Sequence, residues 1–174
     1  SPAWQVRWRA FSICRSRITR TPERLDTTCA IGLMSGTSMD GIDLAMLRTD
    51  GEARVERGPA FFVPYAADFR RRIEAALETA KAIARREERP GDLAALEREI
   101  TLRHAEAVKA FLEGPAKGWG RPEVVGFHGQ TVLHRAPQPG RIGRTRQLGD
   151  GELMASLLGT KVAYDFRSAD VAAG

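Results

Sequence analysis

GLMSGTSMDGIDLA, residues 32–45, is the stretch from which the fold of this chain can be read. The apolar and β-branched run from Thr28 to Leu33 leads into it and the run from Ile42 to Leu47 leads out of it, so a β-strand is predicted on each side. The residues between the runs are mostly Gly, Ser, Thr and Asp, the composition of a turn. Asp50-Gly51 is a hairpin signal, and Val55 to Val63 reads as a third strand. We therefore predict three antiparallel strands with tight connections.

Helical and extended segments alternate in the rest of the chain. Apolar residues recur at helical spacing in two long segments, and short apolar runs bounded by turn signals read as further strands. Asp92 begins the second helical segment, where its side chain suits an N-cap. These patterns predict helices at 69–84, 92–112 and 152–158, strands at 123–127, 145–148 and 161–164, and loops at 136–144 and 165–174. Periodicity alone thus gives an α/β fold class.

The positive charge is concentrated in the first segment. The formal net charge is +5, and residues 1–27 hold six arginines against Glu23 and Asp26, which is +4 and leaves +1 for the rest. A nucleic-acid binder is expected to carry its positive stripe on the folded domain, so nucleic acid is not an expected partner. We interpret residues 1–27 as an atypical basic extension, expected to be disordered, and 28–174 as the folded part.

Cysteine usage and hydropathy favour a cytoplasmic protein without membrane contact. Cys14 and Cys29 are the only cysteines, and they form neither a CxxC pair nor a disulfide framework. No stretch approaches the roughly 18 apolar residues of a membrane span. Arginines interrupt any apolar core of a secretory signal in the first segment.

The segment from Ser35 to Asp43 has the residue types of a phosphate-binding loop. Its glycines allow sharp turns and close approach to a ligand, and its amides and hydroxyls suit phosphate oxygens. Asp40 and Asp43 are oxygen ligands suited to Mg²⁺ or its waters. The segment is neither a Walker A loop, a Rossmann fingerprint nor a nucleophile elbow. An ordinary Gly-rich hairpin turn fits the same residues.

Two further polar segments follow predicted strands. His128 and Gln130 come directly after the strand at 123–127, where α/β folds place ligand contacts, and both side chains can donate and accept hydrogen bonds. Asp165 and Asp170 follow the last strand and are candidate general bases. A strand-capping turn and a solvated loop are the alternative interpretations.

Three segments in this order resemble one known family. They are GLMSGTSMDGIDLA at 32–45, VVGFHGQTVLHR at 124–135 and TRQLGDGELMASLLGTKVAYDFRSADVAAG at 145–174. Together they resemble the anhydro-N-acetylmuramic acid kinases from roughly residue 30 onward. The resemblance implies the N-terminal lobe of a ribonuclease-H-like, actin-like ATPase (sugar kinase) fold. The family pattern continues past the last residue into a second lobe, so the resemblance implies a truncated kinase domain that is inactive when tested alone.

The resemblance also implies a reaction. The family phosphorylates 1,6-anhydro-N-acetylmuramic acid with ATP while water opens the anhydro ring, giving N-acetylmuramic acid 6-phosphate during peptidoglycan recycling in the cytoplasm. ATP and Mg²⁺ are the implied cofactors, and a homodimer is the implied full-length assembly. Another kinase of the actin-like ATPase superfamily and a non-catalytic sugar-binding fragment remain as alternatives, and a nucleic-acid binder rests on residues 1–27 alone.

Roles can be transferred residue by residue onto the matching motifs. His128, Gln130 and Thr131 fall near the sugar. Asp170 matches the catalytic base that activates water, with Asp165 as the second choice. No metal ligand is assigned. The ATP-binding loop comprises Gly36, Thr37, Ser38, Met39, Asp40, Gly41, Ile42 and Asp43.

Overall fold

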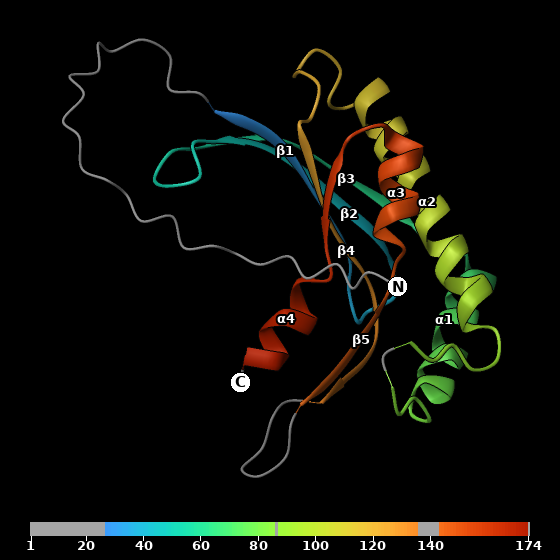
Figure 1. Ribbon diagram of the computed structural model, residues 1–174. Helices are drawn as coiled ribbons and strands as arrows, with labels where there is room; N and C mark the ends of the chain where they lie inside the picture. The colour runs from blue at the N-terminus through green and yellow to red at the C-terminus, as the bar shows by residue number, and fades with distance from the viewer. Residues whose placement is uncertain (1–26, 86, 136–142, 174) are drawn as a thin grey trace.

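A mixed β-sheet forms the centre of the structure. The computed structural model describes residues 27–85, 87–135 and 143–173. In chain order, the elements are β1 (Thr28–Ser35), β2 (Gly41–Thr49), β3 (Val55–Pro64), α1 (Ala67–Ala80), α2 (Leu93–Glu113), β4 (Val124–Arg135), β5 (Arg144–Leu148), α3 (Gly151–Leu158), β6 (Lys161–Tyr164) and α4 (Phe166–Ala173). Helices α1, α2 and α3 lie on one face of the sheet, and the short α4 lies on the other (Figure 1).

The sheet combines the predicted antiparallel meander with parallel strands. Its order is β3-β2-β1-β4-β5, and β6 also pairs with β4. The antiparallel pairing of β1 with β2 and of β2 with β3 confirms the three-strand prediction. β1 and β6 each pair in parallel with the first part of β4. Because these strands run in the same direction, the segments that follow their paired parts meet at one edge of the sheet.

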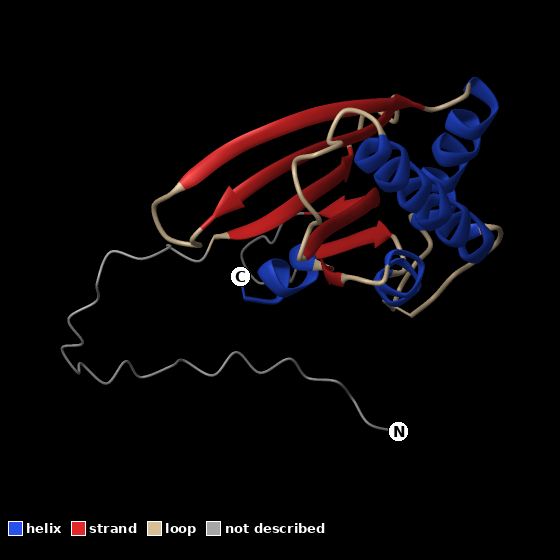
Figure 2. Cartoon of the chain, turned by 90° about the horizontal axis from the view of Figure 1, so that it is seen from above, coloured by secondary structure: helices blue, strands red, loops and turns tan. Residues whose placement is uncertain are grey.

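Alternating burial shows which face of the sheet the helices cover. In β1, Ile31, Leu33 and Ser35 are buried, whereas Gly32 and Met34 are exposed, as a period of two requires. The buried side chains of β1, β2 and β4 pack against α2 and α3 in one cluster. A second cluster joins α1 and α2 to β5 and the distal half of β4. Figure 2 shows the long helices gathered at one side of the curved sheet.

Helices α2 and α3 differ in how their N-termini are capped. Asp150 caps α3, because its Oδ1 accepts the Leu153 amide at 2.9 Å. Asp92 occupies the N-cap position of α2 but makes no capping hydrogen bond. Its carboxylate instead accepts from Arg72 Nη2 at 2.8 Å. The N-cap prediction for Asp92 is therefore right in position and wrong in function.

Three predicted boundaries are wrong. Helix α1 ends at Ala80 and not at 84. The amides of residues 81–83 each bond to the carbonyl three residues earlier, which is the tighter 3₁₀ pattern, and the side chain of Ile83 is buried in the core. The predicted loop at 165–174 contains helix α4, which the Ala-rich end of the segment favours. The strand predicted at 123–127 continues to Arg135. The polar segment after residue 127 is part of the strand, and the backbone bends within it at Gly129, which has a positive φ.

Some predictions fall outside the described residues. Residues 1–26 and 136–142 are among these, so the disordered extension and most of the loop at 136–144 stay predictions. None of the helices in the described part of the chain combines the length and hydrophobicity needed to cross a lipid bilayer.

Candidate active site

The connection between β1 and β2 is a tight turn with an exposed tip. The Met39 amide donates to the Gly36 carbonyl at 3.1 Å, and Met39 takes a positive φ of 53°. The side chains of Thr37, Ser38 and Asp40 are exposed. An exposed turn rich in glycine and hydroxyl residues has the composition of an anion-binding loop.

Asp40 is fixed at the end of this turn. Ser38 Oγ donates to Asp40 Oδ1 at 2.6 Å, and this hydrogen bond lowers the pKa of the Asp40 carboxyl below its usual value. The Asp40 carbonyl accepts the Tyr65 amide at 2.8 Å, which ties the turn to the end of β3. Asp40 therefore presents a charged carboxylate at a defined backbone position.

The remaining predicted loop residues lie in β2. Gly41 packs so closely on β3 that an added Cβ would clash with a carbonyl oxygen of that strand. Ile42 is 1% exposed in the core, so its side chain supports the loop from below. Asp43 is exposed on the face of the sheet that α1 and α2 leave uncovered.

The predicted sugar-contacting residues lie inside β4, around the kink at Gly129. This glycine has φ of 69°, and the pairing of β1 with β4 shifts register beside it. The regular alternation of buried and exposed residues along β4 ends at this glycine. His128 is partly exposed, whereas Gln130 and Thr131 are 0% and 8% exposed. The structure therefore turns His128 outward and Gln130 and Thr131 inward.

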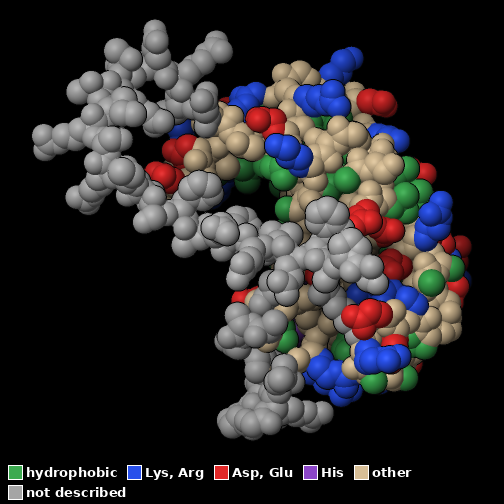
Figure 3. All heavy atoms as spheres, viewed as in Figure 1, with side chains coloured by type: hydrophobic (Ala, Val, Ile, Leu, Met, Phe, Trp, Pro, Cys, Tyr) green, Lys and Arg blue, Asp and Glu red, His purple; other side chains and the backbone are tan. Residues whose placement is uncertain are grey.

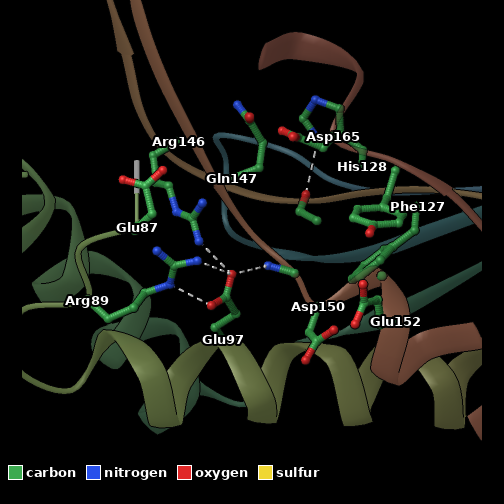
Figure 4. Close-up of a pocket in the computed structure, with 14 residues that line it drawn as sticks. Glu87, Arg89, Glu97, Phe127, His128, Arg146, Gln147, Asp150, Glu152 and Asp165 are labelled. Atoms are coloured by element: carbon green, nitrogen blue, oxygen red, sulfur yellow. Dashed lines mark hydrogen bonds and ion pairs between the residues drawn. The ribbon is translucent and has the colours of Figure 1, made fainter. Parts of the chain in front are cut away.

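His128 lies between two concave surfaces. Its Nδ1 is 3.1 Å from the Gly129 carbonyl, which only accepts, so Nδ1 is the donor and Nε2 is the acceptor of the neutral ring. On the side of α2 and α3 it borders a pocket of about 310 Å³, which Asp165 also lines (Figure 4). Phe127 and Tyr164 give this pocket an aromatic wall. Aromatic and polar groups together suit a small sugar.

A buried ion network forms the opposite wall of this pocket (Figure 4). The Glu97 carboxylate accepts from Arg89 Nε at 2.6 Å and from Arg146 Nη2 at 2.8 Å. It also accepts the Gly149 amide at 3.2 Å. The side chains of Glu97 and Arg146 are only 14% and 9% exposed. The network therefore joins α2, β5 and two loops at the edge of the pocket.

The sequence analysis did not identify this network. Its members are far apart in the chain, and charged residues in a helical segment normally face solvent. One signal was present: Glu97 is four residues after Leu93 and three before Ile100, so it lies on the buried stripe of α2. A charged residue on an apolar stripe predicts a buried partner.

One candidate base, Asp165, directly precedes α4, and the other, Asp170, lies within this helix. Asp165, with a positive φ of 61°, lines the pocket beside His128. Asp170 is exposed and lies one helical turn after Phe166, on the same side of α4. Phe166 borders the open face of the sheet, as His128 does.

The open face is apolar. Met34, Phe62 and Phe166 are 50%, 44% and 47% exposed there, around a hollow of about 760 Å³. Figure 3 shows hydrophobic side chains in the hollow of this side, whereas charged side chains of both signs cover the helices.

Two carboxylates of the predicted loop segment, Asp40 and Asp43, are of the residue type that could hold a magnesium ion. Within the described ranges, no three His, Cys, Asp or Glu side chains are grouped as a metal site. Mg²⁺ typically uses one or two protein carboxylates, with waters and substrate phosphates completing its shell. Asp40 and Asp43 are carboxylates of this type, and both are exposed.

These elements define a class of protein. The meander with its exposed loop, the parallel strand that carries His128 and the helix after the last strand form a lobe of the actin-like ATPase fold used by sugar kinases. Comparison with known proteins narrows the class. The profile of the family described as anhydro-N-acetylmuramic acid kinase matches residues 28–174. The chain belongs to this family.

Relatives with the same description are about half identical in sequence. The Rhizobium etli protein is 53% identical over 145 residues, and the Agrobacterium fabrum protein is 54% identical over 145 residues. Each match covers 83% of this chain and 38% of the relative. The Brucella suis protein is 49% identical over 149 residues, which is 86% of this chain and 39% of the relative. This chain thus spans about two fifths of the length of these relatives.

Proposed function

We propose that this chain forms one lobe of a kinase for 1,6-anhydro-N-acetylmuramic acid. The observation that carries the proposal is the position of the exposed loop 36–40 at the sheet edge shared with His128, within a segment matched by that kinase family. ATP and Mg²⁺ are the proposed cofactors. The proposed setting is peptidoglycan recycling in the cytoplasm, and the proposed full-length assembly is a homodimer.

The proposed roles follow the positions of the residues. Loop 36–40 holds the ATP phosphates through backbone amides and the Thr37 hydroxyl, Ser38 holds the Asp40 carboxylate in the loop, and Gly41 to Asp43 support the loop from β2. The Asp40 and Asp43 carboxylates would hold Mg²⁺ or its waters, and Mg²⁺ would neutralise phosphate charge. His128 reaches the sugar with its ring, and Thr131, 8% exposed, supports that segment from within.

The proposed reaction joins hydrolysis to phosphoryl transfer. The Asp170 carboxylate accepts a proton from water as the water oxygen bonds to the anomeric carbon. The bond from this carbon to O6 breaks, and O6 takes the γ-phosphoryl group of ATP, leaving ADP. Asp165 is the second candidate for the base, because it lines the pocket beside His128. A positioned base contributes about 10²–10⁴-fold to such a step.

A substrate panel tests the proposal. The protein for this test, here named the chimeric kinase, carries residues 28–174 in place of the matching segment of the Rhizobium etli relative. We expect ADP formation with 1,6-anhydro-N-acetylmuramic acid, and a product whose mass increases by one phosphoryl group and one water. N-acetylglucosamine, N-acetylmuramic acid and acetate should give no ADP above background.

Two outcomes would replace the proposal. Preference for another sugar or an acyl acceptor would indicate a different kinase of the superfamily. Binding of the anhydro-sugar without turnover in a folded chimeric kinase would favour a sugar-binding function.

A further inference from the structure

The side chain of Gln130 is enclosed by protein. It is 0% exposed, although the neighbouring strand residue His128 is partly exposed. The kink at Gly129 accounts for the difference, since its positive φ rotates the following residue into the interior. A side chain in this position does not offer its amide to a sugar in the pocket beside His128.

The Gln130 amide is directed at the loop between β1 and β2. Gln130 Nε2 donates to the Gly36 carbonyl at 3.1 Å and to its neighbour Thr131's carbonyl at 3.3 Å. Because both acceptors are carbonyls, the amide must present its NH₂ group to them, which fixes its orientation. The Oε1 atom is buried and has no hydrogen-bond partner among the described residues.

The Gly36 carbonyl is the group that closes the loop turn. It accepts the Met39 amide at 3.1 Å in addition to Gln130 Nε2, so both of its lone pairs are used. Ser35, the residue before it, is 1% exposed and pairs in register with Gln130. The loop is therefore joined to β4 at its first residue by a side chain and by strand pairing.

We propose that Gln130 is a positioning residue for the phosphate loop and does not contact the sugar. Its amide holds the Gly36 carbonyl, which the Met39 amide also bonds, and so sets the direction of the amides of residues 37 and 38 toward the nucleotide phosphates. This proposal rests on the proposed kinase function for its catalytic consequence, but the loop-holding role can be tested independently.

The test uses Gln130→Met, which keeps side-chain length and removes the donor, and Gln130→Glu, which places a carboxylate against the two carbonyls. Thr160→Val is the matched control. Thr160 Oγ1 also donates to a backbone carbonyl, that of Pro122, at 3.1 Å, but far from the loop in the chain. Thermal unfolding of each variant establishes that it is folded.

The first measurement is amide hydrogen exchange on the 174-residue chain. We expect the Met39 amide to exchange about five- to tenfold faster in Gln130→Met, the factor expected for loss of one neutral hydrogen bond. It should be unchanged in Thr160→Val. In the wild type, the Gln130 side-chain amide protons should themselves be protected. Exposed, rapidly exchanging Gln130 amide protons would overturn the proposal even if both Gln130 variants failed to fold.

The second measurement separates the two substrates in the chimeric kinase. Gln130→Met should raise KM for ATP about five- to tenfold and leave KM for the anhydro-sugar unchanged. An increase in KM for the sugar alone would overturn the positioning role and favour direct sugar contact. An inactive wild-type chimeric kinase would count against the proposed function only, because the exchange measurement still decides the role of Gln130.

Discussion

At the scale of single residues, Gly129 determines which groups reach the site. Its positive φ separates the outward His128 from the inward Gln130. An added Cβ there would clash with the Leu148 carbonyl. Gly32 is the natural contrast, because an added Cβ at this residue meets no atom within 4 Å and its φ is not positive.

Gly129→Ala should lower the free energy of unfolding by about 2 kcal/mol or more, since strain and steric overlap act together. Gly32→Ala should change it by less than about 0.5 kcal/mol. Urea unfolding of both variants measures the difference. Equal stabilities would show that the kink does not need glycine.

A second single residue, His104, makes the stability of the fold depend on pH. It is 0% exposed, its Nδ1 is 2.8 Å from the Ile100 carbonyl, and its Nε2 is buried without a partner among the described residues. Burial lowers its pKa from 6.5 to about 4. Between these values the unfolded chain binds a proton that the folded chain does not, so stability is complete above pH 6.5 and falls as the pH drops toward 4.

The expected loss from this group is roughly 3 kcal/mol at pH 4 relative to pH 7. His104→Leu should flatten the stability profile between pH 4 and 6.5. A profile for His104→Leu as steep as that of the wild type would show that other groups cause the acid sensitivity.

At the scale of elements, the ion network around Glu97 joins α2 to β5 and to the loop after it. Arg146 is 9% exposed, so removing its partner leaves a buried charge uncompensated. Glu99, two residues along the same helix, pairs with Arg72 and Arg103 at side-chain exposures of 32% to 42%. Substitutions at the two glutamates therefore compare a buried ion pair with more exposed ion pairs on the same helix.

Glu97→Gln should destabilise the chain by about 3 kcal/mol, whereas Glu99→Gln should cost less than about 1 kcal/mol. Urea unfolding at pH 7 measures both. Similar losses for the two variants would show that burial does not decide the contribution of the Glu97 network.

Sequence reasoning predicted elements better than their ends. The meander, helices α2 and α3 and strand β6 follow from local periodicity and turn residues, because the side chains that define them are close in the chain. The length of β4 and the inward turn of Gln130 depend on a backbone angle at Gly129 that no local pattern specifies. The Glu97 network depends on contacts across 49 residues of sequence between Glu97 and Arg146, which only the fold brings together.

At the scale of the whole molecule, the chain offers a loop, a pocket and an open apolar face, and it spans 38% of the Rhizobium etli relative. The resemblance implies that a second lobe holds most nucleotide base and ribose contacts. We therefore predict that the 174-residue chain alone forms no ADP above background in the anhydro-sugar assay, whereas the chimeric kinase does. Turnover by the 174-residue chain alone would show that it contains a complete active site.

The most direct test of the central claim is the rate of ADP formation by the chimeric kinase with Asp170→Asn. Asp165→Asn is the comparison, because Asn tolerates the positive φ at this residue and the fold should be retained. We predict that Asp170→Asn lowers kcat by about 10²–10⁴-fold without loss of ATP binding, and that Asp165→Asn has the smaller effect. A wild-type rate with Asp170→Asn would contradict the assignment of the base and, with it, the proposed arrangement of the active site.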